Sequence, residues 1–155
     1  MQGVAIEKIV KKLELSNWTE NMDLKKHRIL LSDVNRPALQ LSGYFNHFEE
    51  KRVQIIGNVE YTYLQQLEPE RKIEIYREFL KYEIPCVIFC RDLRPDDDFL
   101  RIAMENEVPV LGTNRSTSEF MAELIYILSE QLAPCITIHG VLVDVYGEGL
   151  LIMGE

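Results

Sequence analysis

Short apolar runs that alternate with amphipathic helical patterns are the feature of this chain that most restricts its fold. Residues 85–90 and 108–111 are apolar runs of strand length, and helical patterns cover residues 96–106 and 116–132. Strands joined by helices of this length pair in parallel through right-handed crossovers. The sequence therefore predicts an α/β fold with βα units and a mainly parallel sheet.

Start signals support the predicted helices. Residues 116–119 form a Ser-x-x-Glu capping box, and Pro69 stands where the first turn of a helix over residues 69–82 tolerates a proline. The aspartates at residues 96–98 are candidates for binding a cation, but consecutive carboxylates at a helix start do not converge on one ion. We therefore expect them to cap the helix and favour its dipole. Residues 4–13 predict a further amphipathic helix.

The segment between residues 29 and 63 gives weaker signals. Residues 29–31 and 53–57 have strand composition, whereas residues 38–41 are compatible with the start of a helix or with a strand. Aromatic residues follow Gly43 and Gly57, and we interpret them as packing residues and not as binding platforms.

The charge balance of the chain excludes one class of partner. A net charge of −8 and a pI near 5.0 argue against a nucleic-acid partner, because phosphate backbones are bound by concentrated Lys and Arg. The N-terminus lacks the basic and apolar stretches of a signal peptide, and no apolar run reaches the ~18 residues that a membrane span needs. We expect a cytoplasmic protein without a membrane or nucleic-acid partner.

The cysteines predict neither a disulfide nor a metal site. Cys86 and Cys90 lie within an apolar run, where a thiol behaves as a small hydrophobic group. Together with Cys135 they cannot all pair, and their spacing is not that of common zinc ligands. We expect them to be buried and structural.

The last residues predict a β-hairpin that leads into a glycine. Residues 141–146 alternate in polarity, residues 147–149 supply a turn, and residues 150–153 are apolar. A strand followed by glycine is how a phosphate-binding P-loop begins, so Gly154 and Glu155 are candidates for the start of such a loop. A simple turn is the commoner meaning of a glycine after a strand.

Two side chains of the predicted hairpin could carry chemistry. An imidazole at His139 could donate to nucleotide phosphates or stabilise developing charge, although a half-exposed strand histidine bonded to a carbonyl is the alternative. Asp144 could be a metal ligand or base, but its alternation with valines favours a solvent-facing carboxylate. The break at Ala133 and Pro134 predicts a domain boundary between residues 1–132 and 133–155.

Basic residues follow two of the predicted strands. Arg91 and Arg94 come after one strand, and residues 113–116, which include Arg115, come after the next. Ligands of parallel α/β sheets gather at the carboxyl ends of strands, and Arg115 beside a helix N-terminus would suit an anion such as a sugar phosphate. Ordinary loop solvation is the alternative.

Several motifs together resemble the bacterial HPr kinase/phosphorylase family. They keep the order and spacing of the family and occupy residues 32–37, 41–45, 52–64, 89–95 and 138–147. The resemblance extends over essentially the whole chain. It implies that residues 1–132 form a domain like the N-terminal domains of Mur ligases, and that residues 133–155 are a linker and the first hairpin of a truncated P-loop kinase domain.

The resemblance also implies a function for the complete protein. It would be a bifunctional enzyme that phosphorylates a serine of the phosphocarrier protein HPr with ATP or pyrophosphate and Mg²⁺, and reverses the reaction by phosphorolysis. The enzyme would be a homohexamer. Its activity would link sugar uptake by the phosphotransferase system to carbon catabolite repression. His139 corresponds to the active-site histidine of the family, and Gly154 and Glu155 correspond to the start of its ATP-binding loop.

The P-loop Lys and Ser, the catalytic Asp and Arg, and the metal ligands would follow residue 155. We therefore expect the 155 residues alone to be inactive and to bind no cofactor tightly, because phosphoryl transfer depends on those groups. The alternative hypothesis is a non-catalytic regulatory or oligomerisation module that senses a phosphorylated metabolite at Arg91, Arg94 and Arg115.

Overall fold

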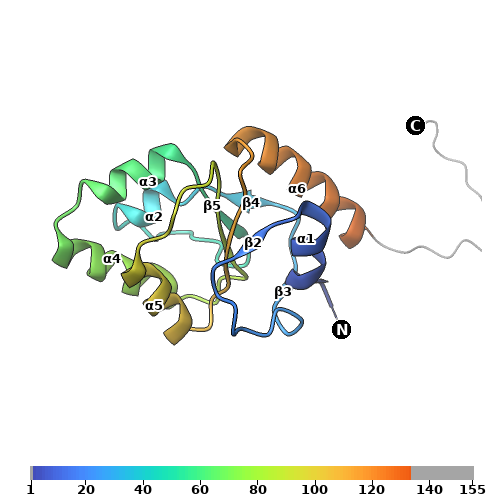
Figure 1. The fold of residues 1–155 in the computed structure, drawn as a ribbon, viewed down its shortest axis with the longest axis horizontal. Coiled ribbons are helices and arrows are strands. Elements are labelled where there is room, and N and C mark those ends of the chain that lie inside the picture. Colours follow the sequence, from blue (N-terminus) through green and yellow to red (C-terminus); the bar gives the residue numbers. More distant parts are fainter. Residues whose placement is uncertain (1, 134–155) are drawn as a thin grey trace, which may run out of the picture.

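The structure is a computed structural model that describes residues 2–133. Its main sheet contains β2 (Ser16–Asn17), β4 (Val34–Asn35), β5 (Val53–Ile56), β6 (Val87–Phe89) and β7 (Val110–Gly112), in the spatial order β2-β7-β6-β5-β4 (Figure 1). The last four pair in parallel, and β2 pairs antiparallel with β7 at one edge. The predicted α/β fold with a mainly parallel sheet is confirmed.

The helices largely follow the sequence patterns. They are α1 (Ile6–Leu13), α2 (Ala38–Leu41), α3 (Asn58–Gln65), α4 (Pro69–Leu80), α5 (Asp97–Glu105) and α6 (Thr117–Leu132). The first helix starts later than predicted because β1 (Val4–Ala5) pairs antiparallel with β3 (Arg28–Ile29). The ambiguous residues 38–41 are helical, and α3 was not predicted at all.

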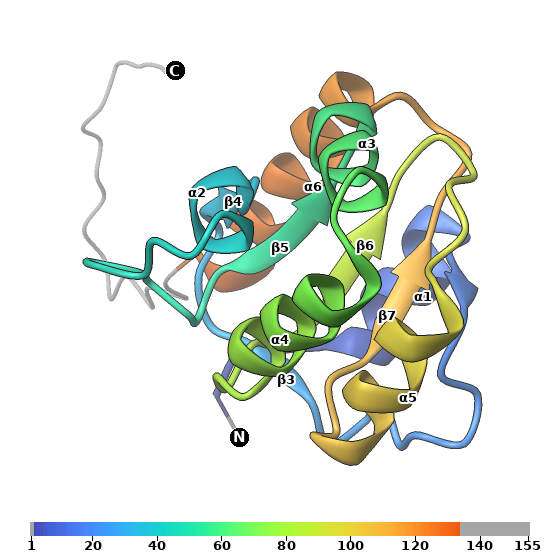
Figure 2. The same ribbon diagram turned by 90° about the vertical axis from the view of Figure 1, so that its left-hand side faces the viewer.

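Helices cover both faces of the sheet. Figures 1 and 2 show α1 and α6 on one side and α2, α3, α4 and α5 on the other. Alternate side chains of the strands enter the two cores: Val53 and Ile55 of β5 pack with α1 and α6, whereas Ile56 packs with the helices of the opposite face. This two-sided burial explains why the strands are almost continuously apolar.

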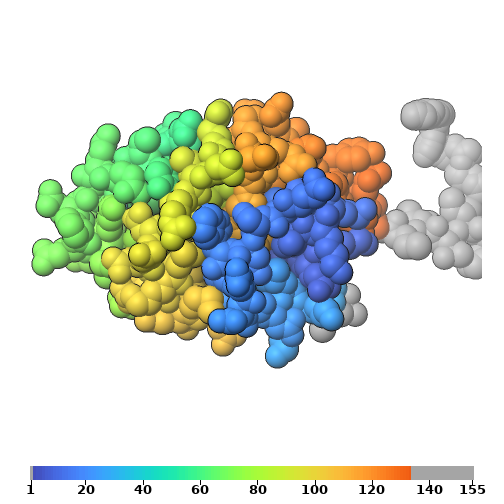
Figure 3. Space-filling model, viewed as in Figure 1, coloured from blue at the N-terminus to red at the C-terminus, as the bar shows by residue number. Residues whose placement is uncertain are grey.

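The N-terminal segment closes one edge of the sheet. Trp18 N donates to Val110 O (2.9 Å), and Val110 N donates to the buried Thr19 Oγ1 (3.2 Å). In Figure 3 this blue segment lies between yellow α5 and orange α6. It pairs with β7 and so covers backbone groups that would otherwise form an open edge.

The start of α5 differs from its prediction. Asp96 occupies the N-cap position, but its side chain makes no capping hydrogen bond. Its carboxylate accepts from Tyr76 Oη (2.5 Å), Lys72 Nζ (3.2 Å) and Gln65 Nε2 (3.3 Å) instead. The expected capping role of Asp96 is therefore wrong, because polar groups of α4 and of the end of α3 reach the carboxylate.

The start of α6 agrees better with the sequence. Ser116 Oγ accepts from Glu119 N (3.3 Å), as a capping box requires. Ser116 Oγ also donates to Glu119 Oε1 (3.0 Å), so the two side chains close the cap by contacting each other.

Cys86 and Cys90 are buried, as predicted. Cys135 lies outside the described residues. Within residues 2–133, none of the helices has the length and apolar character that crossing a membrane requires.

Candidate functional site

The carboxyl ends of the parallel strands bring four loops to one edge of the sheet. Arg36 follows β4, Gly57 follows β5, Cys90 follows β6 and Thr113 follows β7. In Figure 2 this edge lies at the top, where α3 and α6 begin close to the ends of their strands. Ligand sites of parallel α/β sheets form at such an edge.

Gly57 is the point at which two of these loops meet α6. A Cβ atom on Gly57 would lie 2.6 Å from Arg36 Nη2 and 2.6 Å from Thr117 Oγ1. Only a residue without a side chain allows both polar groups to approach the backbone so closely. We call Arg36, Gly57 and Thr117 the Gly57 junction.

A buried ion pair holds Arg36 at this junction. Arg36 Nη2 lies 2.9 Å from Glu60 Oε1, and the same carboxylate oxygen accepts from Gly57 N at 2.8 Å. Glu60 is 3% exposed and lies in the first turn of α3, where a negative charge favours the helix dipole. Among residues 2–133, Nη2 alone of the Arg36 guanidinium donates a hydrogen bond, and the Arg36 side chain remains 37% exposed.

Thr117 contacts both Gly57 and Cys90. Burial raises the pKa of the Cys90 thiol to about 11, while the Thr117 hydroxyl and the charges of Arg36 and Arg91 act in the opposite direction. The thiol is therefore neutral near pH 7 and is not an activated nucleophile. Thr117 is 4% exposed, and its hydroxyl has no nitrogen or oxygen partner within residues 2–133.

The guanidinium of Arg115, a candidate to bind an anion, is held by groups of the protein. Its Nη1 donates to Leu13 O (2.7 Å), and its Nε lies 2.9 Å from Glu123 Oε1. These contacts tie the end of α1 to α6. Sequence proximity to a helix N-terminus does not fix the direction of a long side chain.

Arg91 and Arg94 differ in their surroundings. Arg91 and Asp92 have φ values of 59° and 57°, and their amides donate to Arg115 O and Thr113 O, both at 3.0 Å. The exposed Arg91 has no ion pair within residues 2–133. Arg94 lies over the Trp18 ring, with 5.2 Å from Cζ to the ring centroid, and 3.8 Å from Asp97. The charge of Arg91 acts to lower the pKa of the Cys90 thiol.

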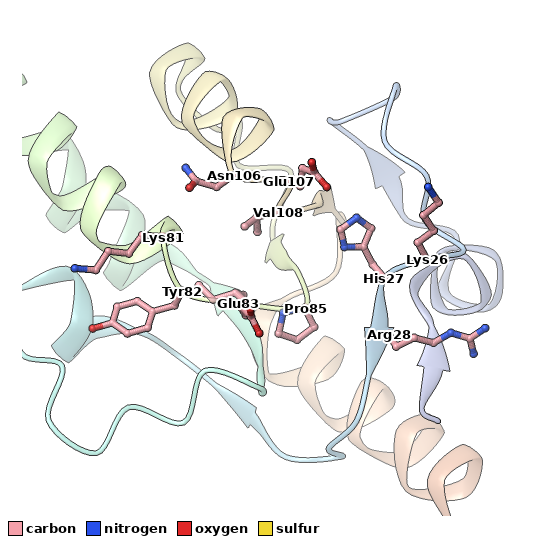
Figure 4. A pocket seen from close by; sticks show the side chains of 11 residues that line it. Lys26, His27, Arg28, Lys81, Tyr82, Glu83, Pro85, Asn106, Glu107 and Val108 are labelled. Carbon is pink, nitrogen blue, oxygen red and sulfur yellow. The ribbon is translucent and has the colours of Figure 1, made fainter. Parts of the chain in front are cut away.

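Cavities within residues 2–133 also lie away from this junction, among them two that contain basic residues. One of about 250 Å³ lies beside Arg115, and its lining includes the carboxylates of Glu14 and Asp92, so it is poorly suited to an anion. Another of about 310 Å³ lies at the opposite edge of the sheet (Figure 4). There the Tyr82 ring and the Arg28 guanidinium point away from the hollow, so its polar groups do not converge.

The residues predicted to carry catalysis are not described by the structure. His139, Gly154 and Glu155 lie outside residues 2–133, as does Asp144. Their roles stay predictions.

Sequence reasoning also missed the pairing of Arg36 with Glu60 and the contact of Gly57 with Thr117. A glycine directly between a buried strand and a helix was the one available signal.

Comparisons with known proteins identify relatives over the whole chain. The family model described as HPr Serine kinase N terminus matches residues 4–128. HPr kinase/phosphorylase of Lachnoclostridium phytofermentans is 49% identical over 155 residues, and that of Latilactobacillus sakei is 38% identical over 153 residues. The matches cover 100% and 99% of this chain, but only 50% and 49% of the two relatives. The chain thus spans about half the length of these curated relatives.

A solved structure shares the fold at low sequence identity. It contains the CBS and DRTGG domains of the regulatory region of Clostridium perfringens pyrophosphatase, with the activator diadenosine tetraphosphate. The TM-score is 0.54 and the identity 17%, over 78% of this chain and 45% of that chain. This likeness concerns the fold. The expected similarity to Mur ligase domains stays a prediction.

Proposed function

Because the chain belongs to the HPr serine kinase family, we propose that it is the N-terminal part of an enzyme that phosphorylates a serine of HPr. The complete enzyme would use ATP or pyrophosphate with Mg²⁺ and would reverse the reaction by phosphorolysis. The observation that carries this proposal is the 49% identity to an HPr kinase/phosphorylase across all 155 residues. The cytoplasmic location, the hexamer and the link to carbon catabolite repression belong to the same proposal.

In this proposal, catalysis belongs to residues beyond the described part. His139 would act at the active site, and Gly154 and Glu155 would begin the ATP-binding loop. No G-x-x-x-x-G-K-[ST] motif occurs within the 155 residues. Positioning by the P-loop, the metal and charged groups accounts for most of the rate of phosphoryl transfer, so residues 2–133 would serve as a scaffold or a regulator.

The test compares the full-length protein with the 155-residue chain. Purified HPr is incubated with each protein, ATP and Mg²⁺, and phosphoserine is measured by mass spectrometry. We expect transfer by the full-length protein and none by the 155-residue chain. Phosphorylation of HPr by the short chain, or its absence with the full-length protein, would contradict the proposal.

A matched pair of variants tests the role of His139 in the full-length protein. We expect His139→Ala to lower the rate of HPr phosphorylation about 100-fold, as expected for the loss of one group that stabilises transition-state charge. His47→Asn is the control, because His47 is exposed with φ of 61°, a conformation that asparagine tolerates. If His139→Ala and His47→Asn phosphorylate HPr at the same rate, His139 does not act at the active site.

We also propose a second function for residues 2–133, a regulatory module that senses a phosphorylated metabolite. The approach of Arg36 and Thr117 to Gly57, beside the starts of α3 and α6, favours it. The guanidinium of Arg115, which is held by Leu13 and Glu123, would not take part.

A further inference from the structure

The cavity of about 250 Å³ beside Arg115 lies where the chain crosses from one face of the sheet to the other. The loop after β6 leads to α5, whereas the loop after the neighbouring β7 leads to α6, and Figures 1 and 2 show these two helices on opposite faces. Asp92 from the first loop and Thr113 and Asn114 from the second line the cavity. Ligands of open α/β sheets bind at such a change of face, outside the carboxyl ends of the strands. The topology and the cavity thus indicate the same place.

Polar side chains without a protein partner surround this cavity. Glu14, Ser16, Asp92 and Asn114 all line it, and their side chains make no hydrogen bond or ion pair within residues 2–133. A single exposed side chain of this kind is ordinarily solvated. Here four of them face one hollow, where a single ligand can contact several at once.

Thr113 adds a buried hydroxyl whose hydrogen has no acceptor. Thr113 is 6% exposed, and its Oγ1 accepts from Arg115 N (3.2 Å) and from Arg115 Nη1 (3.4 Å). A hydroxyl offers two acceptor positions and one donor, so both acceptor positions are used, while the donor has no partner within residues 2–133. A buried donor without an acceptor is unfavourable. An oxygen atom of a ligand in the cavity would satisfy it.

The balance of donors and acceptors selects the class of ligand. The carboxylates of Glu14 and Asp92 only accept hydrogen bonds and disfavour an anion, whereas Thr113 needs an acceptor, which an ammonium group lacks. Within the described residues, no group of three or more His, Cys, Asp or Glu side chains could hold a metal ion. A hydroxyl group both donates and accepts. At ~30 Å³ for each water, the cavity has the volume of about eight waters, which limits the ligand to the size of a monosaccharide.

We propose that this cavity binds a neutral monosaccharide or a polyol of similar size. Hydroxyls of the ligand donate to the carboxylates of Glu14 and Asp92 and accept from the Thr113 hydroxyl, while Ser16 and Asn114 can do both. The inference goes beyond the two proposed functions, because the cavity is separate from the Gly57 junction and its ligand carries no phosphate.

The test is an amide ¹⁵N–¹H titration of the 155-residue chain with D-glucose, D-fructose and mannitol, each in a separate experiment. We expect saturable shifts at Asp92, Thr113 and Asn114 with at least one of the three. The affinity should change less than about twofold between low and high salt, because the ligand is uncharged. The absence of saturable shifts with all three compounds, or shifts centred elsewhere, would overturn the proposal.

Two variants remove one carboxylate each. Asp92→Asn and Glu14→Gln keep the size of the side chain, and asparagine tolerates the φ of 57° at residue 92. We expect each variant to weaken sugar binding about five- to tenfold, since a charged acceptor is replaced by a neutral one. If both variants bind with the affinity of the unchanged chain, the carboxylates do not hold the ligand and the proposal is wrong.

Glu107→Gln is the matched control for these variants. Glu107 is an exposed carboxylate with a similar φ of 56°, but it lies at the opposite edge of the sheet. We expect its sugar affinity to stay within about twofold of the unchanged chain. A loss as large as that of Asp92→Asn would show a general effect of charge and would contradict a site at this cavity.

Glucose 6-phosphate separates this proposal from the sensing of a phosphorylated metabolite. At the Gly57 junction it would shift Asn58 and Thr117, whereas in the cavity it would shift Asp92 and Thr113. We expect it to bind in the cavity no more tightly than glucose, because two carboxylates lie there. Binding at Asp92 and Thr113 by glucose 6-phosphate but not by glucose would overturn the proposal.

Discussion

At the scale of single residues, Gly57 is defined by what surrounds it and not by an unusual backbone. Its φ of −112° is accessible to any residue. The requirement for glycine comes from Arg36 Nη2 and Thr117 Oγ1, which occupy the space next to its Cα. Arg36 cannot retreat freely, because the buried Glu60 holds it.

Gly57→Ala tests this steric requirement. Because the φ of Gly57 is open to any residue, replacing it by alanine would ordinarily raise the free energy of unfolding by ~0.4–1 kcal/mol. The gain would come from the lower conformational entropy of the unfolded chain. We expect instead a loss of about 1–3 kcal/mol in the free energy of unfolding, because the added methyl group overpacks the junction. Urea unfolding followed by circular dichroism measures the change.

A double variant separates sterics from other causes. Gly57→Ala combined with Thr117→Ala removes one of the two contacts that the new methyl group meets. We expect the double variant to be less destabilised than the sum of the two single changes, as for residues in contact. Additive effects would show that the Gly57–Thr117 contact does not set the requirement for glycine.

At the scale of elements, the Asp96 carboxylate joins α4 to the start of α5. Partial burial by itself would raise the pKa of Asp96, but hydrogen bonds from Tyr76, Lys72 and Gln65 outweigh it and hold that pKa below its usual range. Burial, followed by the bond to Asp96, raises the pKa of Tyr76, so the phenol stays protonated and keeps donating. The charged carboxylate thus stabilises the docked helices.

This linkage predicts a dependence of stability on pH. The folded pKa of Asp96 lies below the unfolded value of about 3.9, so its stabilising contribution is fully present above that value and is lost as the pH falls through the folded pKa. We expect Asp96→Asn to lower the free energy of unfolding by about 1–3 kcal/mol at pH 7. The difference from the unchanged chain should shrink below pH ~4, which urea unfolding at several pH values would show.

Asp98→Asn is the matched control for Asp96→Asn. Asp98 lies on the same helix, but its side chain is 56% exposed and pairs with Arg101 on the surface. We expect Asp98→Asn to change the free energy of unfolding by less than about 1 kcal/mol, without a marked pH dependence. Equal costs for both variants would show that the contacts of Asp96 have no special importance.

The same elements show what the sequence alone can predict. The helix α6 followed from its periodicity and cap, and β6 from its apolar run. The helix α3 could not be predicted, because only Glu60 and Leu64 of its residues are buried and one of them is charged. Two-residue strands such as β2 and β4 are too short to show any period.

The candidate site was less predictable than the fold for a related reason. The sequence identified the correct edge of the sheet, since strand ends follow from the βα pattern. The pair of Arg36 and Glu60, however, joins residues 24 apart, and the meeting of Gly57 with Thr117 spans two crossovers. Contacts of this kind depend on tertiary packing, which no local pattern encodes.

At the scale of the whole molecule, the described residues 2–133 form two hydrophobic cores, whose members run from Val4 to Leu132. We therefore expect a chain that ends at Ala133 to fold with an unfolding free energy within about 0.5 kcal/mol of the 155-residue chain. Urea unfolding monitored by Trp18 fluorescence measures it. Loss of a cooperative transition would contradict the predicted domain boundary after residue 132.

A shorter chain is the control for this truncation. Ending the chain at Glu123 removes Leu124 and Leu128, which are both fully buried. Each buried leucine contributes about 2–5 kcal/mol, a large part of the total stability of a small domain. We expect this chain not to fold.

The pairing of β2 with β7 has a consequence for how the protein is made. Thr19 and Val110, which bond across this edge, are separated by 91 residues. A ribosome adds about 5–20 residues per second, so the early segment waits roughly 5–20 s before its partner strand is synthesised. During that interval the growing chain carries its apolar N-terminal residues without the strand that covers them, and this is when protection by a chaperone would matter most.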